Sequence, residues 1–226
     1  MGSERYSRQQ AILTEEGQAL LAQKRVLIAG CGGLGGHLIE NMLRVGVGSV
    51  TAVDPDRFEE SNLNRQLLST EPLLGALKAE AAAARAKAVN SAVAFRAVPQ
   101  AFSAENGDEL VRGCDLVLDG LDSATDRLLL EDICARHNVP LVHGAILGEL
   151  VQAAVVPPGS GMLHTIYAGA GSAEGPKTSI AYTPACCAAI QCAQAVKLLL
   201  NQRPPLWGKL LQLNLDTMTE DVLSFL

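Results

Sequence analysis

The chain has no excess of basic residues and no long apolar run. Among its 226 residues, 18 Lys and Arg face 24 Asp and Glu, which gives a formal net charge of −6. This balance supplies no basic surface for non-specific nucleic-acid binding. The N-terminus is polar and lacks the apolar core of a leader peptide, and no stretch is long enough to span a bilayer. We therefore expect a cytoplasmic protein that binds neither nucleic acid nor a membrane.

The six cysteines include no Cys-x-x-Cys pair, the spacing typical of a zinc site. In a cytosolic chain they are expected to pack in the core, act in catalysis or bind a metal rather than form disulfides. Cys186 and Cys187 lie in the first turn of a predicted helix, where a thiol pKa is lowered. One of them is therefore a candidate nucleophile, although the surrounding alanines favour the packing of small side chains.

Strand and helix patterns alternate along the first two thirds of the chain. The predicted strands cover 25–29, 49–53, 93–98, 115–118 and 139–143, and the predicted helices cover 10–22, 34–43, 75–90, 104–112 and 123–137. Such alternation predicts an α/β fold with a doubly wound, mostly parallel, Rossmann-like sheet and helices on both faces.

The pattern changes after residue 143. A β-rich run over 150–156 is followed by a long loop over 157–180 that is rich in Gly, Ser and Pro. Thr183 and Pro184 are typical of an N-cap and a first helical residue, and predict a helix that extends to about residue 200. Two strands over 209–214 and 220–225 then form a hairpin. We therefore expect a C-terminal antiparallel extension of the sheet.

The run from Val26 to Gly35 joins the first strand to a helix through a glycine-rich turn. Glycines allow a tight turn and a close approach of the backbone to a ligand, and the first N–H groups of a helix have no partners within it. The helix dipole adds positive potential there. The turn therefore predicts a phosphate site, with NAD as the default ligand, and its candidate contacts are Gly30, Gly32, Gly33 and Gly35.

Charged residues after the second strand favour ATP over NAD. Asp54 ends that strand, where a carboxylate can bind a ribose; the alternative is an ordinary turn residue. Arg65 and Lys78 follow it. Transfer at a phosphate shifts charge onto phosphate oxygens, which cations stabilise, whereas hydride transfer creates no such charge. The alternative is that these cations lie on a solvated helix face, which explains a single Lys or Arg well but explains the presence of both less well.

Asp122 follows the strand over 115–118, at the end of the sheet where open α/β folds bind ligands. A carboxylate in that place can hold a Mg²⁺ ion that bridges phosphates. The alternative is that Asp122 caps the helix over 123–137.

Together, these motifs resemble the ThiF/MoeB/HesA family, the bacterial relatives of ubiquitin-activating enzymes. The order and spacing match over residues 1–150, and more loosely to the end of the chain. The motifs are Arg5-Tyr6-Ser7-Arg8-Gln9, Gly30-x-Gly32-Gly33-Leu34-Gly35, Asp54-x-Asp56, Ser61-Asn62-Leu63-x-Arg65-Gln66, Gly75-x-x-Lys78 and Asp119-x-x-Asp122.

The resemblance implies an adenylyltransferase. Such an enzyme uses ATP and Mg²⁺ to adenylate the C-terminal glycine of a small ubiquitin-like sulfur-carrier protein ending in Gly-Gly, and releases pyrophosphate. The family motifs imply that ATP is bound by the four glycines and by Asp54, Asp56, Asn62, Arg65, Gln66 and Lys78, and that Asp122 binds the metal. They also imply a homodimer in which Arg8 reaches the partner's site; from its own chemistry, an exposed N-terminal arginine is usually only solvated.

The sequence departs from the family in two places. Many members bind a structural zinc through two Cys-x-x-Cys pairs, which are absent here, so we predict no zinc. Members that bind their carrier covalently place a cysteine in the loop before the last long helix, the crossover loop; residues 157–181 contain none. His143 and His164 have no partner that the sequence reveals, and no role is assigned to them.

A single domain over 1–226 is expected, with a helical arm over 1–22, a nucleotide-binding core over 23–145 and the crossover loop, helix and last strands over 146–226. Three other functions stay open. A tRNA-modifying dehydratase-type enzyme would need a basic patch, which the acidic composition disfavours. Arg65, Lys78 and Asp122 argue against an NAD(P)-dependent oxidoreductase. A catalytically silent subunit would usually have lost part of that set.

Overall fold

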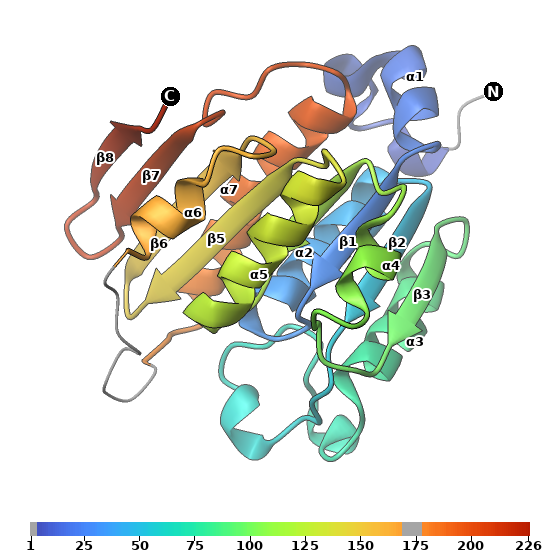
Figure 1. Cartoon of the computed structure of the whole chain (residues 1–226). Helices are drawn as coiled ribbons and strands as arrows, with labels where there is room; N and C mark the ends of the chain where they lie inside the picture. The colour runs from blue at the N-terminus through green and yellow to red at the C-terminus, as the bar shows by residue number, and fades with distance from the viewer. Residues whose placement is uncertain (1–3, 169–177) are drawn as a thin grey trace.

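The computed structural model describes residues 4–168 and 178–226, which form one eight-stranded sheet in the order β3-β2-β1-β4-β5-β6-β7-β8 (Figure 1). Strands β1 to β5 pair in parallel and β5 to β8 pair antiparallel. The predicted α/β fold and its antiparallel extension are therefore confirmed. The strands are β1 (Arg25–Ala29), β2 (Ser49–Val53), β3 (Ala94–Val98), β4 (Leu116–Asp119), β5 (Leu141–Leu147), β6 (Leu150–Val156), β7 (Lys209–Asn214) and β8 (Thr219–Ser224).

Helices cover both faces of the sheet. One core contains buried residues of α1, α2, α3 and α7, and the other contains those of α4, α5 and α6. The helices are α1 (Gln10–Leu21), α2 (Gly33–Val45), α3 (Lys78–Val89), α4 (Gly107–Val111), α5 (Ala124–Arg136), α6 (Met162–Ile166) and α7 (Tyr182–Leu199), with short 3₁₀ turns η1 (Glu4–Tyr6), η2 (Glu60–Asn62) and η3 (Glu71–Leu73). Among the described residues, no helix combines the length and apolarity needed to cross a bilayer.

Strand β1 shows why the sheet is doubly wound. Val26 and Ile28 pack into one core, while Leu27 and Ala29 pack into the other. A parallel strand covered on both faces needs apolar residues at its successive buried positions, as the four residues after the exposed Arg25 are. All eight described strands belong to one sheet. The single domain over 1–226 and its division into three parts stay predictions.

The region after β6 differs from the prediction of a loop over 157–180. The short helix α6 lies there, and residues 169–177 of the predicted loop fall outside the described residues. Glu131 on α5 accepts hydrogen bonds from the N–H groups of Leu163 and His164, at 3.0 and 3.2 Å. This tertiary cap stabilises a turn that local sequence does not reveal.

Helix α7 begins at Tyr182, two residues before the predicted first helical residue Pro184, so the expected N-cap role of Thr183 is wrong. The hydroxyl of Thr183 instead donates to the carbonyl of Gly148, at 2.9 Å. Gly148 turns β5 into β6 with φ of +58°, and β5 itself extends to Leu147 rather than ending at 143. Thr183 therefore ties α7 to the β5–β6 hairpin.

Candidate nucleotide site

The glycine turn between β1 and α2 packs directly against the end of β4. A Cβ on Gly30 would lie 2.5 Å from the carbonyl oxygen of Gly120, and one on Gly35 would lie 1.8 Å from the carbonyl oxygen of Gly30. Neither position can hold a side chain without moving backbone. The contacts also place the turn after β4, which leads to Asp122, beside the glycine turn.

Gly32 and Gly33 have a different role from the two packed glycines. A Cβ on either would meet its nearest atoms only at 3.7 and 3.6 Å, which is ordinary contact. Both residues are half-buried, and Gly32 offers no side-chain cap to the first turn of α2. No side chain therefore caps this helix N-terminus, and the anion site predicted there stays a prediction.

Asp54 lies buried at the end of β2 and holds the turn in place. One of its carboxylate oxygens accepts from the N–H of Cys31 at 2.7 Å, and the other accepts from the N–H of Asp56 at 2.8 Å. Burial raises the pKa of Asp54, and these two hydrogen bonds oppose the rise. Each oxygen keeps a further lone pair for a ligand hydroxyl. Asp54 therefore acts as a turn residue, which was the alternative to ribose binding, and its contact with a ribose stays a prediction.

Lys78 and Asp56 form an ion pair at the start of α3. The ammonium nitrogen of Lys78 lies 2.9 Å from a carboxylate oxygen of Asp56. The side chain of Lys78 is only 7% exposed, whereas that of Asp56 is 63% exposed. The alternative of a solvated cation on a helix face therefore does not describe Lys78. An ammonium group has three donors, so the pair leaves donors for a phosphate.

The segment that carries η2 lies across the glycine turn. The guanidinium of Arg65 donates to the carbonyl of Ser61 and to the side chain of Asn64, each at 2.9 Å, and its stem approaches Gly33. Gln66 is buried beside Gly32, and its Oε1 has no hydrogen-bond partner among the described residues. A ligand hydroxyl at this edge of the sheet could donate the hydrogen bond that this buried oxygen lacks.

Asn62 contributes to the shape of this segment. Its Oδ1 accepts from the N–H of Glu59 at 3.1 Å, and the two residues form a reciprocal cap of η2. Its Nδ2 donates to the hydroxyl of Ser61 at 3.3 Å. The buried amide therefore fixes the loop that presents Arg65, and its contact with ATP stays a prediction.

Asp122 is exposed in the turn between β4 and α5. The interpretation of Asp122 as a helix cap is wrong, because Ser123 is the N-cap of α5 and accepts from the N–H of Asp126. Among residues 4–168 and 178–226, no three metal-ligating side chains gather in one place. An exposed carboxylate fits Mg²⁺, which keeps several waters and shares substrate phosphates, better than a metal that needs an all-protein cage.

Arg8 lies away from the other predicted site residues. The hydroxyl of Tyr6 accepts from Asn90, after the end of α3, and Gln9 donates to the carbonyl of Val45 at the end of α2. Helix α2 has 13 residues and is about 20 Å long. The segment around Arg8 thus lies at the amino edge of the sheet, opposite the glycine turn, and Figure 1 shows α1 at that end.

A comparison with protein families decides where the chain belongs, because the model described as the ThiF family matches residues 6–225. The chain belongs to the ThiF family. The resemblance predicted from the motifs is therefore confirmed, and the match includes every predicted site residue.

Relatives of this ThiF-family chain include the SAMP-activating enzyme E1 of Haloferax volcanii, which is 35% identical over 98% of this chain and 85% of its own length. The sulfur carrier protein adenylyltransferase of Thermus thermophilus is 35% identical over 92% of this chain and 82% of its own length. The crystal structure of E. coli MccB with succinimide has a TM-score of 0.85 at 21% identity, covering 99% of this chain and 72% of MccB. That last likeness shows the fold alone.

The cysteines of α7 in this ThiF-family chain lack the features of an activated thiol. Cys187 is fully buried and donates to the carbonyl of Gln152 at 3.3 Å. Burial raises the pKa of both Cys186 and Cys187, whereas an activated thiol needs a lowered pKa. The packing interpretation is therefore the better supported of the two.

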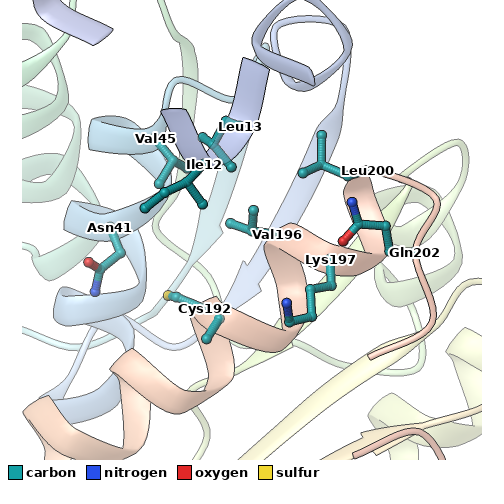
Figure 2. Close-up of a pocket in the computed structure, with 10 residues that line it drawn as sticks. Ile12, Leu13, Asn41, Val45, Cys192, Val196, Lys197, Leu200 and Gln202 are labelled. Carbon is teal, nitrogen blue, oxygen red and sulfur yellow. The ribbon is translucent and has the colours of Figure 1, made fainter. Parts of the chain in front are cut away.

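A cavity of about 350 Å³ lies between the helices α1, α2 and α7, which cover the same face of the sheet (Figure 2). Its walls are mostly apolar, with Lys197, Gln202 and Asn41 at its margins. None of the predicted site residues lines it, so it is separate from the nucleotide site. Ile12, on its α1 side, is 82% exposed.

Sequence reasoning missed a buried polar cluster next to Asp122. His143, on β5, is fully buried, and its Nδ1 lies 2.6 Å from a carboxylate oxygen of Asp119 at the end of β4. Arg127 and Tyr167 complete the cluster. Asp119 ends β4, and His143 ends the strand predicted over 139–143, although β5 itself extends to Leu147. Two ionisable residues at the ends of neighbouring predicted strands are the signal that could have revealed the pair. His164 instead pairs on the surface with Asp132, at 2.8 Å.

Proposed function

We propose that the chain uses Mg·ATP to adenylate the C-terminal glycine carboxylate of a small ubiquitin-like sulfur-carrier protein. The observation that carries the proposal is the meeting of a glycine-rich turn, two cations and an exposed carboxylate at one edge of a ThiF-family sheet. The names of the relatives support the acceptor: one is a sulfur carrier protein adenylyltransferase and another a SAMP-activating E1.

The reaction joins a carboxylate to the α-phosphorus of ATP. A carboxylate oxygen forms a bond to the α-phosphorus as the bond to the bridging oxygen of the β-phosphate breaks, and pyrophosphate leaves with those electrons. Negative charge grows on the departing oxygens, where Arg65 and Lys78 stabilise it. Asp54 and Gln66 hold the ribose, and Asn62 and Asp56 shape the loops that present the two cations.

Asp122 would hold the Mg²⁺ ion, which when bound neutralises charge on the phosphate oxygens. The absence of zinc, expected from the missing Cys-x-x-Cys pairs, is a further prediction that metal analysis of the purified protein tests. A cytoplasmic location and a carrier tail ending in Gly-Gly also stay predictions.

We also propose a homodimer in which Arg8 completes the partner's site. Its support is the position of Arg8 at the amino edge of its own sheet, a helix length away from its own glycine turn. Within one chain this arginine cannot reach the phosphates, so a catalytic role requires a second copy.

ATP–pyrophosphate exchange tests the proposal. The purified chain is mixed with labelled pyrophosphate, Mg·ATP and small ubiquitin-like proteins from the same genome that end in Gly-Gly. We expect exchange with one carrier and none with the same carrier lacking its last glycine. Equal exchange with the intact and the shortened carrier would contradict the proposed acceptor. Reduction of added NAD(P), in the absence of any exchange, would support the oxidoreductase alternative.

A further inference from the structure

We propose that Tyr167, acting through Arg127, positions the turn that carries Asp122 and so joins the start of the crossover loop to the metal site. The inference rests on the proposed metal role of Asp122. Tyr167 and Arg127 are positioning residues in this account, because neither is required to touch ATP or the metal.

The support is a ring of four polar side chains from four segments, in which three contacts are hydrogen bonds and the fourth, between Arg127 and Asp119, is an ion pair. His143 on β5 contacts Asp119 at the end of β4, at 2.6 Å, and the hydroxyl of Tyr167 lies 3.3 Å from the other ring nitrogen of His143. Arg127 on α5 donates to that hydroxyl at 3.0 Å, and its Nε lies 3.4 Å from the Asp119 carboxylate. Asp119 and His143 are fully buried.

The hydrogen bonds of the ring are mutually consistent. Burial lowers the pKa of His143 and outweighs the opposing effect of Asp119. The lowered pKa keeps the imidazole neutral. A neutral ring has one donor and one acceptor. Since a carboxylate only accepts, Nδ1 donates to Asp119, and Nε2 therefore accepts from the hydroxyl of Tyr167. That hydroxyl in turn accepts from Arg127, so each of these contacts pairs a donor with an acceptor.

The ring fixes the residue directly before Asp122. Arg127 donates to the carbonyl of Leu121 at 2.6 Å, and the second carboxylate oxygen of Asp119 accepts from the N–H of Leu121 at 2.8 Å. Both backbone polar groups of Leu121 are thus held by ring members. The peptide that enters Asp122 has its direction set by Arg127, and the orientation of Arg127 is set by Asp119 and Tyr167.

Tyr167 is the ring member that belongs to the crossover loop. It directly follows α6, whose N-terminus is capped by Glu131 on the same helix, α5, that carries Arg127. Its hydroxyl is therefore the link by which this loop acts on the Asp122 turn. The placement of α6 and Tyr167 is therefore linked to the placement of the turn that carries Asp122.

Calorimetry of ATP binding to the full chain tests the inference without any turnover. ATP is titrated with Mg²⁺ present and again with EDTA, and the ratio of the two Kd values measures how far the metal strengthens binding. In Tyr167→Phe we expect the metal-free Kd to stay as in the wild type and the ratio to fall roughly three- to tenfold, the effect of one lost hydrogen bond. A residue with only a structural role would lower the fraction of binding-competent protein and leave the ratio unchanged.

Tyr182→Phe is the matched control, because it removes a hydroxyl that donates to Glu149, outside the ring. It should leave both Kd values as in the wild type. A second variant, Arg127→Lys, keeps a positive charge beside Asp119 but removes the fork that reaches Leu121, and should lower the ratio at least as much. Thermal unfolding of each variant checks that it is folded.

The outcomes separate the inference from the proposed function. A folded Tyr167→Phe protein with the wild-type ratio, or an equal fall in Tyr182→Phe, would overturn the positioning role. A wild-type protein that binds ATP equally well with Mg²⁺ and with EDTA would instead overturn the metal role of Asp122.

Discussion

Replacement of Lys78 by methionine should separate catalysis from stability. The ion pair of Lys78 with Asp56 has one buried partner and one partner that is 63% exposed, and pairs with such an exposed member contribute about 0–1 kcal/mol to stability. Methionine fills the space of the lysine stem, so Lys78→Met should lower the free energy of unfolding by no more than about 1 kcal/mol. Loss of one group that stabilises developing charge typically lowers a rate about 10²- to 10³-fold.

The assay for Lys78→Met is carrier-dependent ATP–pyrophosphate exchange, with urea unfolding on the same preparation. Lys24→Met is the matched control, because Lys24 pairs with Asp115 at 3.4 Å at the amino end of β1, opposite the proposed site. We expect it to exchange like the wild type. Wild-type exchange by Lys78→Met, or an equal loss in Lys24→Met, would refute the charge argument.

Three more results are expected. Arg8→Ala and Asp122→Ala should each be inactive while folded, and a mixture should regain up to about a quarter of wild-type exchange if each dimer has two sites built across its interface; no recovery would contradict the shared site. Gly35→Ala should fail to fold or melt far below the wild type, since its Cβ would lie 1.8 Å from a backbone oxygen, whereas Gly33→Ala should keep the fold and weaken ATP binding, as thermal melts and calorimetry would show. Burial raises the pKa of Glu40, but hydrogen bonds from two arginines outweigh it and lower the pKa below 4.5. The resulting stability is present above about pH 4.5 and lost as the pH falls through the folded pKa, so Glu40→Gln should flatten the acid side of the stability–pH curve, and an unchanged curve would contradict this.

The parts of the fold that local pattern determines were predicted from the sequence. Strand β1 is apolar at four successive positions because both faces are covered, and Gly46 ends α2 in the left-handed conformation, as the run Gly46-Val47-Gly48 indicated. Helix α6 was missed because its N-terminus is capped by Glu131, some thirty residues away. Thr183 was misassigned because its hydroxyl bonds the distant carbonyl of Gly148 rather than its own helix.

The candidate site likewise has features that the sequence predicted and features that it could not predict. The glycine turn, Asp54, Arg65 and Asp122 follow strand ends, and parallel strands bring such positions to one edge. The pairing of Lys78 with Asp56 and the ring around His143 depend on side chains from several segments, so spacing alone could not predict them. Arg8 matched a family motif, yet its place at the opposite edge follows from the contacts of Tyr6 and Gln9.

The most direct test of the central claim follows an oxygen atom. A carrier labelled with ¹⁸O in its C-terminal carboxylate is incubated with the chain and Mg·ATP, the product is released with hydroxylamine, and the AMP is examined by mass spectrometry. If the carboxylate attacks the α-phosphorus, the AMP carries ¹⁸O and pyrophosphate accumulates. Unlabelled AMP, or formation of ADP and phosphate instead, would contradict the account.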